Sequence, residues 1–238
     1  MKSLIIYRCC DAELNSKEFK HIRPLWFDKL KCFKSYWDEY LNTVTGSYEF
    51  LVVHDGTKKA FYDYISSKTN NIIKIDYKSN NKSLYETFQI ASESFNTENF
   101  NSVHFIEDDF LARPGFLAAI QHGVNHFNLV TGFDHLDRYK RTDDVTLGKE
   151  YIAFLKATNC HWRTAESTTC TWSCSRSMWE DIKPTVLEYG LEDRELFRAL
   201  FRKGIRLWSP MPGYSTTLDV NTFSPGIDWK QVNDLIKT

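Results

Sequence analysis

Residues Val103-His104-Phe105-Ile106-Glu107-Asp108-Asp109-Phe110 form an apolar run that ends in three consecutive carboxylates. The run predicts a buried strand that delivers its acids to the rim of a sheet. Like charges crowded at a strand end are unfavourable unless a cation or a positively charged ligand compensates them. A divalent metal ion would do so, but a surface acidic turn is an equally common interpretation of such a triplet.

Further apolar runs rich in β-branched residues predict strands at 4–7, 50–53 and 72–75, in addition to 103–106. Apolar stripes at helical spacing predict helices over 26–41 and 84–95. Ser83 with Glu86, and Ser177 with Glu180, fit capping boxes at two helix starts. Strands that alternate with helices indicate an α/β fold, with a Rossmann-like, mainly parallel sheet flanked by helices.

After residue 110, strands and helices continue to alternate, but less regularly. The pattern predicts a helix over 117–127, strands at 129–133, 168–175 and 205–208, and a short helix near 150–157 within a long polar excursion over 134–166. Another helix opens at Glu192-Asp193 and is closed by Gly204. We expect one domain over 1–238, with a nucleotide-binding half at 1–110, an acceptor-binding half at 111–210 and a C-terminal tail at 211–238.

Composition excludes several classes of protein. Of the 238 residues, 42% are hydrophobic and 26% are charged, and the net charge of −1 disfavours a nucleic-acid-binding protein. No signal peptide and no apolar stretch long enough to span a bilayer is recognisable, so we expect a cytoplasmic protein. The six cysteines do not form a disulfide framework, and the spacing of those at 160, 170 and 174 matches no common zinc pattern.

In open parallel sheets, ligands bind beyond the carboxyl ends of the strands. Asp55 follows the second strand and the acidic triplet follows the fourth, so these carboxylates are expected on one rim. Arg8 follows the first strand, and Lys82 lies at the start of a helix whose backbone amides attract anions. The shared rim favours a binding site over an ordinary acidic turn.

Four segments resemble nucleotide-sugar glycosyltransferases of the GT-A fold, of the inverting, family 2-like kind. The strand at 4–7 resembles the opening strand of that family, and Val53-His54-Asp55-Gly56-Thr57 is similar to its second-strand turn. The segment 105–109 resembles its metal-binding DXD motif, and 191–196 resembles the motif that carries the catalytic base. The resemblance covers roughly residues 3 to 210.

The resemblance implies a role for each of these residues. It implies Mn²⁺ or Mg²⁺ held by Asp109 directly and by Glu107 through water, and it makes Asp193 the general base. It also assigns Asp55 and Asp108 to donor binding. Apart from the resemblance, their places at the rim make Arg8 and Lys82 candidates for donor binding. Trp162, an aromatic residue within the polar excursion, and Glu192 are the candidates for acceptor binding. The partners implied are a nucleotide-diphosphate sugar and a glycan or glycoprotein.

One departure concerns the metal. Metal-dependent members of the family often supply a histidine shortly after the last strand, but no histidine follows His161 here. Asp219, a threonine hydroxyl or the diphosphate of the donor would have to replace it.

Alternative functions stay open at this point. A retaining transferase would use Asp193 to orient a substrate, and a non-catalytic module would use the sheet to bind a glycan or a partner protein. A nucleotidyltransferase would usually carry a glycine-rich basic loop after the first strand, and Arg8-Cys9-Cys10-Asp11 does not resemble one. A metal-dependent nuclease is disfavoured by the net charge.

Overall fold

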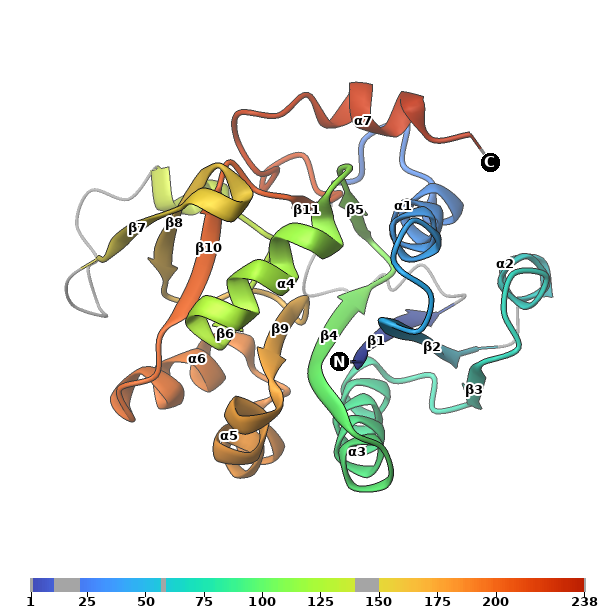
Figure 1. Ribbon diagram of the computed structural model, residues 1–238. Helices are drawn as coiled ribbons and strands as arrows, with labels where there is room; N and C mark the ends of the chain where they lie inside the picture. Colours follow the sequence, from blue (N-terminus) through green and yellow to red (C-terminus); the bar gives the residue numbers. More distant parts are fainter. Residues whose placement is uncertain (1, 11–21, 57–58, 140–149, 238) are drawn as a thin grey trace.

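The computed structural model describes the chain except for residues 1, 11–21, 57–58, 140–149 and 238 (Figure 1). Its centre is a nine-stranded sheet in the order β3-β2-β1-β4-β9-β6-β10-β8-β7. Its strands are β1 (Lys2–Cys10), β2 (Tyr48–Asp55), β3 (Ile72–Ile75), β4 (Phe100–Glu107), β6 (Leu129–Val130), β7 (Ile152–Leu155), β8 (Cys160–Ala165), β9 (Trp172–Ser175) and β10 (Leu207–Met211).

The first four strands of this sheet are parallel to one another, whereas β9 is antiparallel to both of its neighbours. At the other end of the sheet, β8 is antiparallel to β10 and β7. Strand β5 (Phe110–Ala112) continues the chain beyond the acidic triplet and pairs with β11 (Ser215–Thr217) in a separate two-stranded sheet. The predicted α/β fold with a mainly parallel sheet is therefore confirmed.

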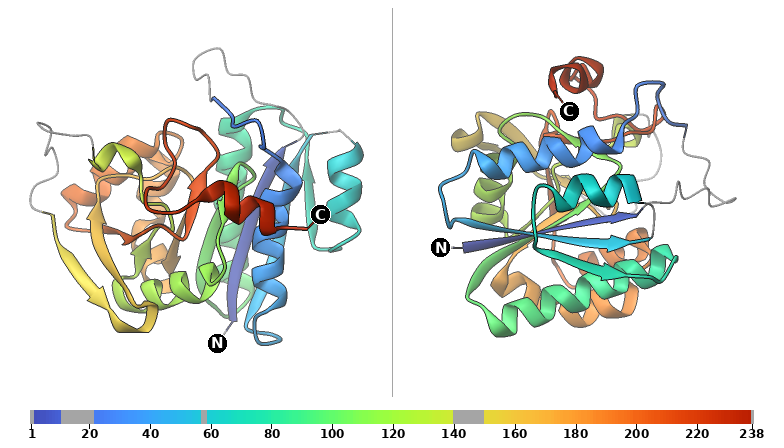
Figure 2. Two further views of the ribbon diagram at one scale, coloured as in Figure 1. Left: turned by 90° about the horizontal axis from the view of Figure 1, so that it is seen from above. Right: turned by 90° about the vertical axis from the view of Figure 1, so that its right-hand side faces the viewer.

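Helices cover both faces of the sheet (Figures 1 and 2). One face is covered by α3, α5 and α6, and the other by α1, α2 and α4, while α7 packs beside α1 at the periphery. These helices are α1 (Lys29–Leu41), α2 (Lys59–Ser66), α3 (Asn80–Thr97), α4 (Phe116–Phe127), α5 (Arg176–Tyr189), α6 (Asp193–Arg202) and α7 (Trp229–Leu235). Among the described residues, no helix is long and apolar enough to cross a membrane.

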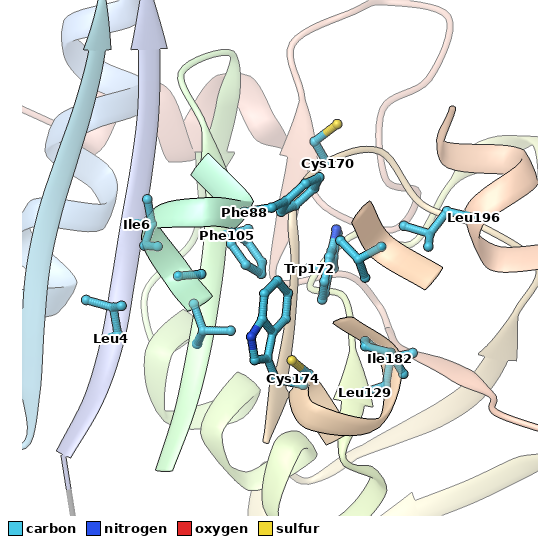
Figure 3. Close-up of a cluster of buried hydrophobic side chains, with 14 of the residues drawn as sticks. Leu4, Ile6, Phe88, Phe105, Leu129, Cys170, Trp172, Cys174, Ile182 and Leu196 are labelled. Atoms are coloured by element: carbon cyan, nitrogen blue, oxygen red, sulfur yellow. The ribbon is translucent and has the colours of Figure 1, made fainter. Parts of the chain in front are cut away.

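The central strands are apolar on both sides because both faces of the sheet are covered. In β1, Leu4 and Ile6 point into the core cluster under α3, α5 and α6, whereas Ile5 and Tyr7 point into the cluster under α1 and α4. In the first cluster the ring of Trp172 packs against Phe88 of α3 and Phe105 of β4, with ring centroids 6.1 and 4.6 Å away (Figure 3). Its packing fixes β4, and with it the position of the triplet.

Several local predictions are wrong. Helices α3 and α5 do not begin at the predicted capping boxes of Ser83 and Ser177, because Ser79 and Ser175 accept the capping hydrogen bonds one turn or less earlier. The predicted helix near 150–157 is instead strand β7 followed by a short 3₁₀ turn, since its backbone pairs with β8. Helix α2 and the small β5–β11 sheet are not anticipated by the sequence patterns.

Candidate functional site

The carboxyl ends of β1, β2 and β4 meet at one rim because these strands are parallel neighbours. The strand register places Arg8 beside Glu107 and Cys10 beside Asp55. The expectation that Asp55 and the acidic triplet share a rim is confirmed. Loops and helix starts then surround this rim with basic and acidic side chains.

Glu107, the first acid of the triplet, forms an ion pair with Arg8. Arg8 also donates from Nη1 to Asn80 Oδ1 at 2.7 Å, which ties the rim to the first residue of α3. Burial raises the pKa of Glu107 to about 7, against the opposing effect of Arg8, and the negative charges of Asp109 and Asp193 raise it further. Burial and the neighbouring carboxylates therefore favour the protonated form of Glu107, whereas the ion pair with Arg8 favours the ionised form.

Asp108, the second acid, forms hydrogen bonds with the end of β1 and the start of α1. Its Oδ2 accepts a hydrogen bond from the backbone N–H of Cys10 at 2.9 Å and from Lys29 Nζ at 2.8 Å. Lys29 is the first residue of α1 and also donates to the Cys10 carbonyl at 3.0 Å. Asp108 thus links β1, β4 and α1 at the rim.

Asp109, the third acid, lies against the segment that follows β11. Its Oδ2 accepts from Arg23 Nη2 at 2.8 Å, and its carbonyl accepts from the backbone N–H of Leu218 at 2.9 Å. Arg23 Nη1 donates in turn to the Leu218 carbonyl at 3.0 Å. One guanidinium therefore bridges the carboxylate and the C-terminal segment.

Asp193 opens α6, and its carboxylate lies near the same rim. The thiol of Cys170 donates to Asp193 Oδ1 with an S–O distance of 3.2 Å. Burial raises the pKa of Asp193 to about 6, while the Cys170 hydrogen bond and the charge of Arg8 act in the opposite direction. The positive charge of Arg8 therefore lowers the pKa values of both Asp193 and Glu107, so the ionisation of both carboxyl groups depends on the same cation.

Of the other predicted donor-binding residues, Asp55 accepts backbone hydrogen bonds, whereas Lys82 is exposed. Asp55 is buried, and its Oδ1 accepts from the backbone N–H groups of Tyr77 and Lys78 at 2.9 and 3.0 Å. These bonds hold the turn between β3 and α3, where Lys78 adopts a positive φ of 52°. Lys82 is exposed in the first turn of α3. Asp55 therefore positions the loop that leads into α3, whose first residue, Asn80, contacts Arg8.

The two predicted acceptor-binding residues differ in exposure. Glu192 is the N-cap residue of α6, is exposed, and its side chain makes no capping hydrogen bond. Trp162 is 0% exposed and lies in β8, with its ring against α4 and its Nε1 bonded to Thr158. The Trp162 ring exposes no face on which a sugar could stack, because it fills the core beneath α4.

Sequence reasoning missed Arg23, Lys29 and Cys170. Each makes a contact with a predicted site residue that is far away along the chain, with separations of 86, 79 and 23 residues respectively. No local periodicity marks such partners. The only available signal was the excess of three adjacent carboxylates, which require compensating charge.

The metal ion implied by the resemblance needs a set of hard oxygen ligands. Within the described part of the chain, no group of three or more His, Cys, Asp or Glu side chains is arranged to hold a metal ion. The carboxylates of the triplet are instead paired with Arg8, Lys29 and Arg23, as given above. As they stand, these residues do not fit a resident divalent ion.

No family model matches the chain, and no curated protein sequence matches it. Among solved structures, 88% of the chain aligns with 35% of S. aureus TarS at 13% identity and a TM-score of 0.49. Similarly, 87% aligns with 68% of glucosyl-3-phosphoglycerate synthase from Mycobacterium tuberculosis, in complex with Mg²⁺ and uridine diphosphate, at 14% identity and a TM-score of 0.48.

A third solved structure has a similar length. There, 99% of the chain aligns with 98% of CMP:2-keto-3-deoxy-manno-octonic acid synthetase in complex with CTP, at 10% identity and a TM-score of 0.49. By contrast, the chain spans 35% of TarS and 58% of its 1–349 portion. At these identities and scores, no residue role is transferred from the three proteins.

Proposed function

We propose that the protein is a glycosyltransferase that moves a sugar from a nucleotide-diphosphate donor to a hydroxyl group of a glycan or protein. The observation that carries the proposal is the cluster of Glu107, Asp193 and Arg8 at the rim where three parallel strands end. Two carboxyl groups with raised pKa values beside a fixed cation are typical of an acid–base site. The GT-A resemblance supplies the reaction class.

The donor would bind across the ends of β1, β2 and β4. Arg8 and Lys82 lie at or near the start of α3, where backbone N–H groups and the helix dipole favour a phosphate. Asp55 and Asp108 are our candidates for hydrogen bonds to the base and ribose. Because Asp55 also holds residues 77–78, its effect on binding includes the shape of that loop.

Asp193 would act as the general base. It takes the proton of the acceptor hydroxyl, the acceptor oxygen forms a bond to the anomeric carbon, and the bond from that carbon to the diphosphate breaks with inversion. A pKa of about 6 suits this task, since the carboxylate is ionised at neutral pH and remains more basic than an ordinary aspartate. Glu192, exposed beside it, is our candidate for acceptor binding.

The resemblance implied a divalent metal ion with Asp109 as direct ligand and Glu107 acting through water. The paired carboxylates do not fit such an ion, because Arg23 and Arg8 hold them. The proposed roles of Asp193, Asp55 and Asp108 do not depend on it.

A thermal-shift screen of nucleoside diphosphates and nucleotide sugars tests donor binding. A ligand that binds only the native protein raises the melting temperature, by an amount that grows with its concentration above Kd. We expect one nucleotide base to stand out, and the matching sugar nucleotide to release its diphosphate when acceptors are added. Protein whose melting temperature responds to none of them would overturn the proposal.

The configuration of the product separates the inverting mechanism from the retaining alternative. With Asp193 as base, the transferred sugar has the opposite anomeric configuration to the donor. NMR of the product's anomeric proton reports this directly. A retained configuration would preserve the transferase but remove the base role from Asp193.

A further inference from the structure

The guanidinium of Arg23 is held in a defined position at the acidic triplet. It donates to Asp109 Oδ2 at 2.8 Å and to the Leu218 carbonyl at 3.0 Å. Its central carbon lies 4.8 Å from the centre of the Phe27 ring, which covers one side of it. The side chain of Arg23 is 28% exposed, so it is held by the protein while part of the side chain still faces solvent.

This position coincides with the one expected for a metal ion. Asp109 is the predicted direct ligand, and the segment after β11 is where a further ligand would be supplied. Leu218 of that segment contacts Asp109 through a backbone hydrogen bond of 2.9 Å and contacts Arg23 through its carbonyl. No histidine follows His161 in the sequence, so the segment carries no imidazole ligand.

The charges of the triplet are balanced without a metal ion. Glu107 pairs with Arg8, Asp108 with Lys29 and Asp109 with Arg23. When all six side chains are ionised, three negative charges meet three positive charges, and their sum is zero. The crowding of carboxylates that suggested a divalent cation is therefore already compensated by side chains.

We propose that Arg23 takes the place of the divalent metal ion, and that it binds the diphosphate of the donor. A guanidinium has five N–H donors in one plane, and its two bonds to Asp109 and Leu218 leave others for phosphate oxygens. Bidentate contacts between arginine and phosphate are short and charge-assisted. This inference rests on the proposed function, because it identifies how the same site neutralises the leaving diphosphate.

The test is a titration of the wild-type protein with the nucleoside diphosphate that gives the largest thermal shift. Calorimetry is run once in EDTA and once with Mn²⁺ after removal of EDTA. We expect the two dissociation constants to agree within about twofold. For Arg23→Met in EDTA we expect weakening of roughly tenfold or more, since a hydrogen bond to a charged group contributes about 1.5–3 kcal/mol.

For Arg23→Met we also expect a response to Mn²⁺ that the wild type lacks. Removing Arg23 leaves Asp109 without this cation, so Mn²⁺ should improve nucleotide binding by Arg23→Met although it does not improve binding by the wild type. Arg23→Lys keeps a charge but loses the planar fork, and should bind more weakly than the wild type while staying independent of metal. Arg202→Met, which removes an exposed charge from the last turn of α6, is the matched control.

The outcomes separate the two proposals. Wild-type binding that appears only with Mn²⁺ would overturn the role of Arg23 and leave the proposed function intact. Equal binding by Arg23→Met and Arg202→Met in EDTA would also overturn it. Absence of binding to any nucleotide, with or without metal, would remove the proposed function and this inference together. Arg23→Lys serves as the reporter should Arg23→Met fail to fold.

Discussion

The thiol of Cys170 is an unusual hydrogen-bond partner for Asp193, the carboxylate that we propose as general base. It donates to Asp193 Oδ1 across 3.2 Å from the segment that precedes β9. Figure 3 shows Cys170 at the edge of the apolar cluster, beyond Phe88 and Trp172. The cluster therefore positions the thiol, and the thiol orients the carboxylate.

Replacing Cys170 should change the pH dependence of transfer. The thiol hydrogen bond lowers the pKa of Asp193, so Cys170→Ala should raise that pKa from its value of about 6. The base is active when ionised, and the acidic limb of the profile of kcat/KM against pH should therefore move to higher pH, by roughly half to one unit.

Cys170→Ser is the control for this prediction, because its hydroxyl preserves a donor at the same place. Its acidic limb should stay close to that of the wild type. A limb that does not move in Cys170→Ala, or that moves to lower pH, would contradict the positioning role. A purely structural defect would lower the rate at every pH without moving the limb.

At the scale of elements, the approach of α4 to β8 explains the burial of Trp162. Gly123 in α4 lies directly over the ring, and a Cβ atom built at this glycine would lie 2.4 Å from Cη2 of Trp162. Phe127, one turn further along α4, packs on the same ring with centroids 5.5 Å apart. The lack of a side chain at Gly123 allows α4 to pack directly on the sheet.

Gly123→Ala should destabilise the protein even though alanine favours helices. In an exposed helix this change would stabilise by about 1 kcal/mol. Here the added methyl group collides with a rigid buried ring, and overpacking of this kind costs about 1–3 kcal/mol. Urea unfolding measures the change in the free energy of unfolding.

A second substitution provides the matched test of that contact. Trp162→Phe removes the ring atoms that the methyl group meets, so the double variant should lose less stability than the sum of the two single variants. Strict additivity, or a more stable Gly123→Ala protein, would show that the helix does not pack as described.

The elements that sequence reasoning predicted well are those with strong internal patterns. The strands at 4–7, 50–53 and 103–106 carry apolar runs that the covered sheet buries. The strand at 72–75 lies at the edge and is partly exposed, and all four strands exist. The segment at 150–157 failed because its conformation is set by pairing with β8, which no local pattern reports. The predicted start of α3 was wrong because two serines lie near it, and Ser79 rather than Ser83 caps the helix.

For the proposed site too, some features could be predicted from the sequence and others could not. Asp55 and the triplet could be placed on one rim, because the topology of parallel strands fixes where their ends lie. The cations that pair with the triplet could not be identified, since the chain brings Arg23 to Asp109 across 86 residues. Trp162 was assigned to the acceptor site from its polar surroundings in the sequence, but tertiary packing places it in the core.

At the scale of the whole molecule, the centre of the sheet contains a buried histidine. His104 in β4 is fully buried, and its Nδ1 lies 3.0 Å from the hydroxyl of Ser173 in β9. Burial lowers its pKa to about 4, so the imidazole is neutral in the folded protein. An unfolded chain would bind a proton at this residue below about pH 6.5.

His104 should therefore make folding stability sensitive to acid. Its stabilising effect is complete above pH 6.5 and is lost as the pH falls towards 4, by up to about 3 kcal/mol. His104→Asn should reduce this loss, measured as the difference in the free energy of unfolding between pH 7 and pH 4.5. The raised pKa of Glu107 acts in the opposite direction, but it is common to both proteins and cancels in the comparison.

One of the two exposed histidines of α4 provides the control for the acid effect. His122→Asn should leave the dependence of stability on pH as it is in the wild type, because His122 is exposed. If His104→Asn lost as much stability in acid as the wild type, the burial of a neutral imidazole would not be the cause.

The two halves of the chain meet at the proposed site. Glu107 ends β4 in the first half, whereas Cys170 and Asp193 belong to the second, and the antiparallel pairing of β4 with β9 joins them. We propose that the first half binds the donor and the second the acceptor. The reaction would then take place between the end of β4, at Glu107, and the start of α6, at Asp193.

The role of Asp193 as general base is tested by comparing the wild type with Asp193→Asn, with donor binding and sugar transfer measured on each protein. Asparagine keeps the shape of the side chain but cannot take a proton. We predict an unchanged dissociation constant for the donor nucleotide and a loss of transfer of about 10²–10⁴-fold, the usual contribution of a general base. Transfer near the wild-type rate with intact donor binding would contradict the account.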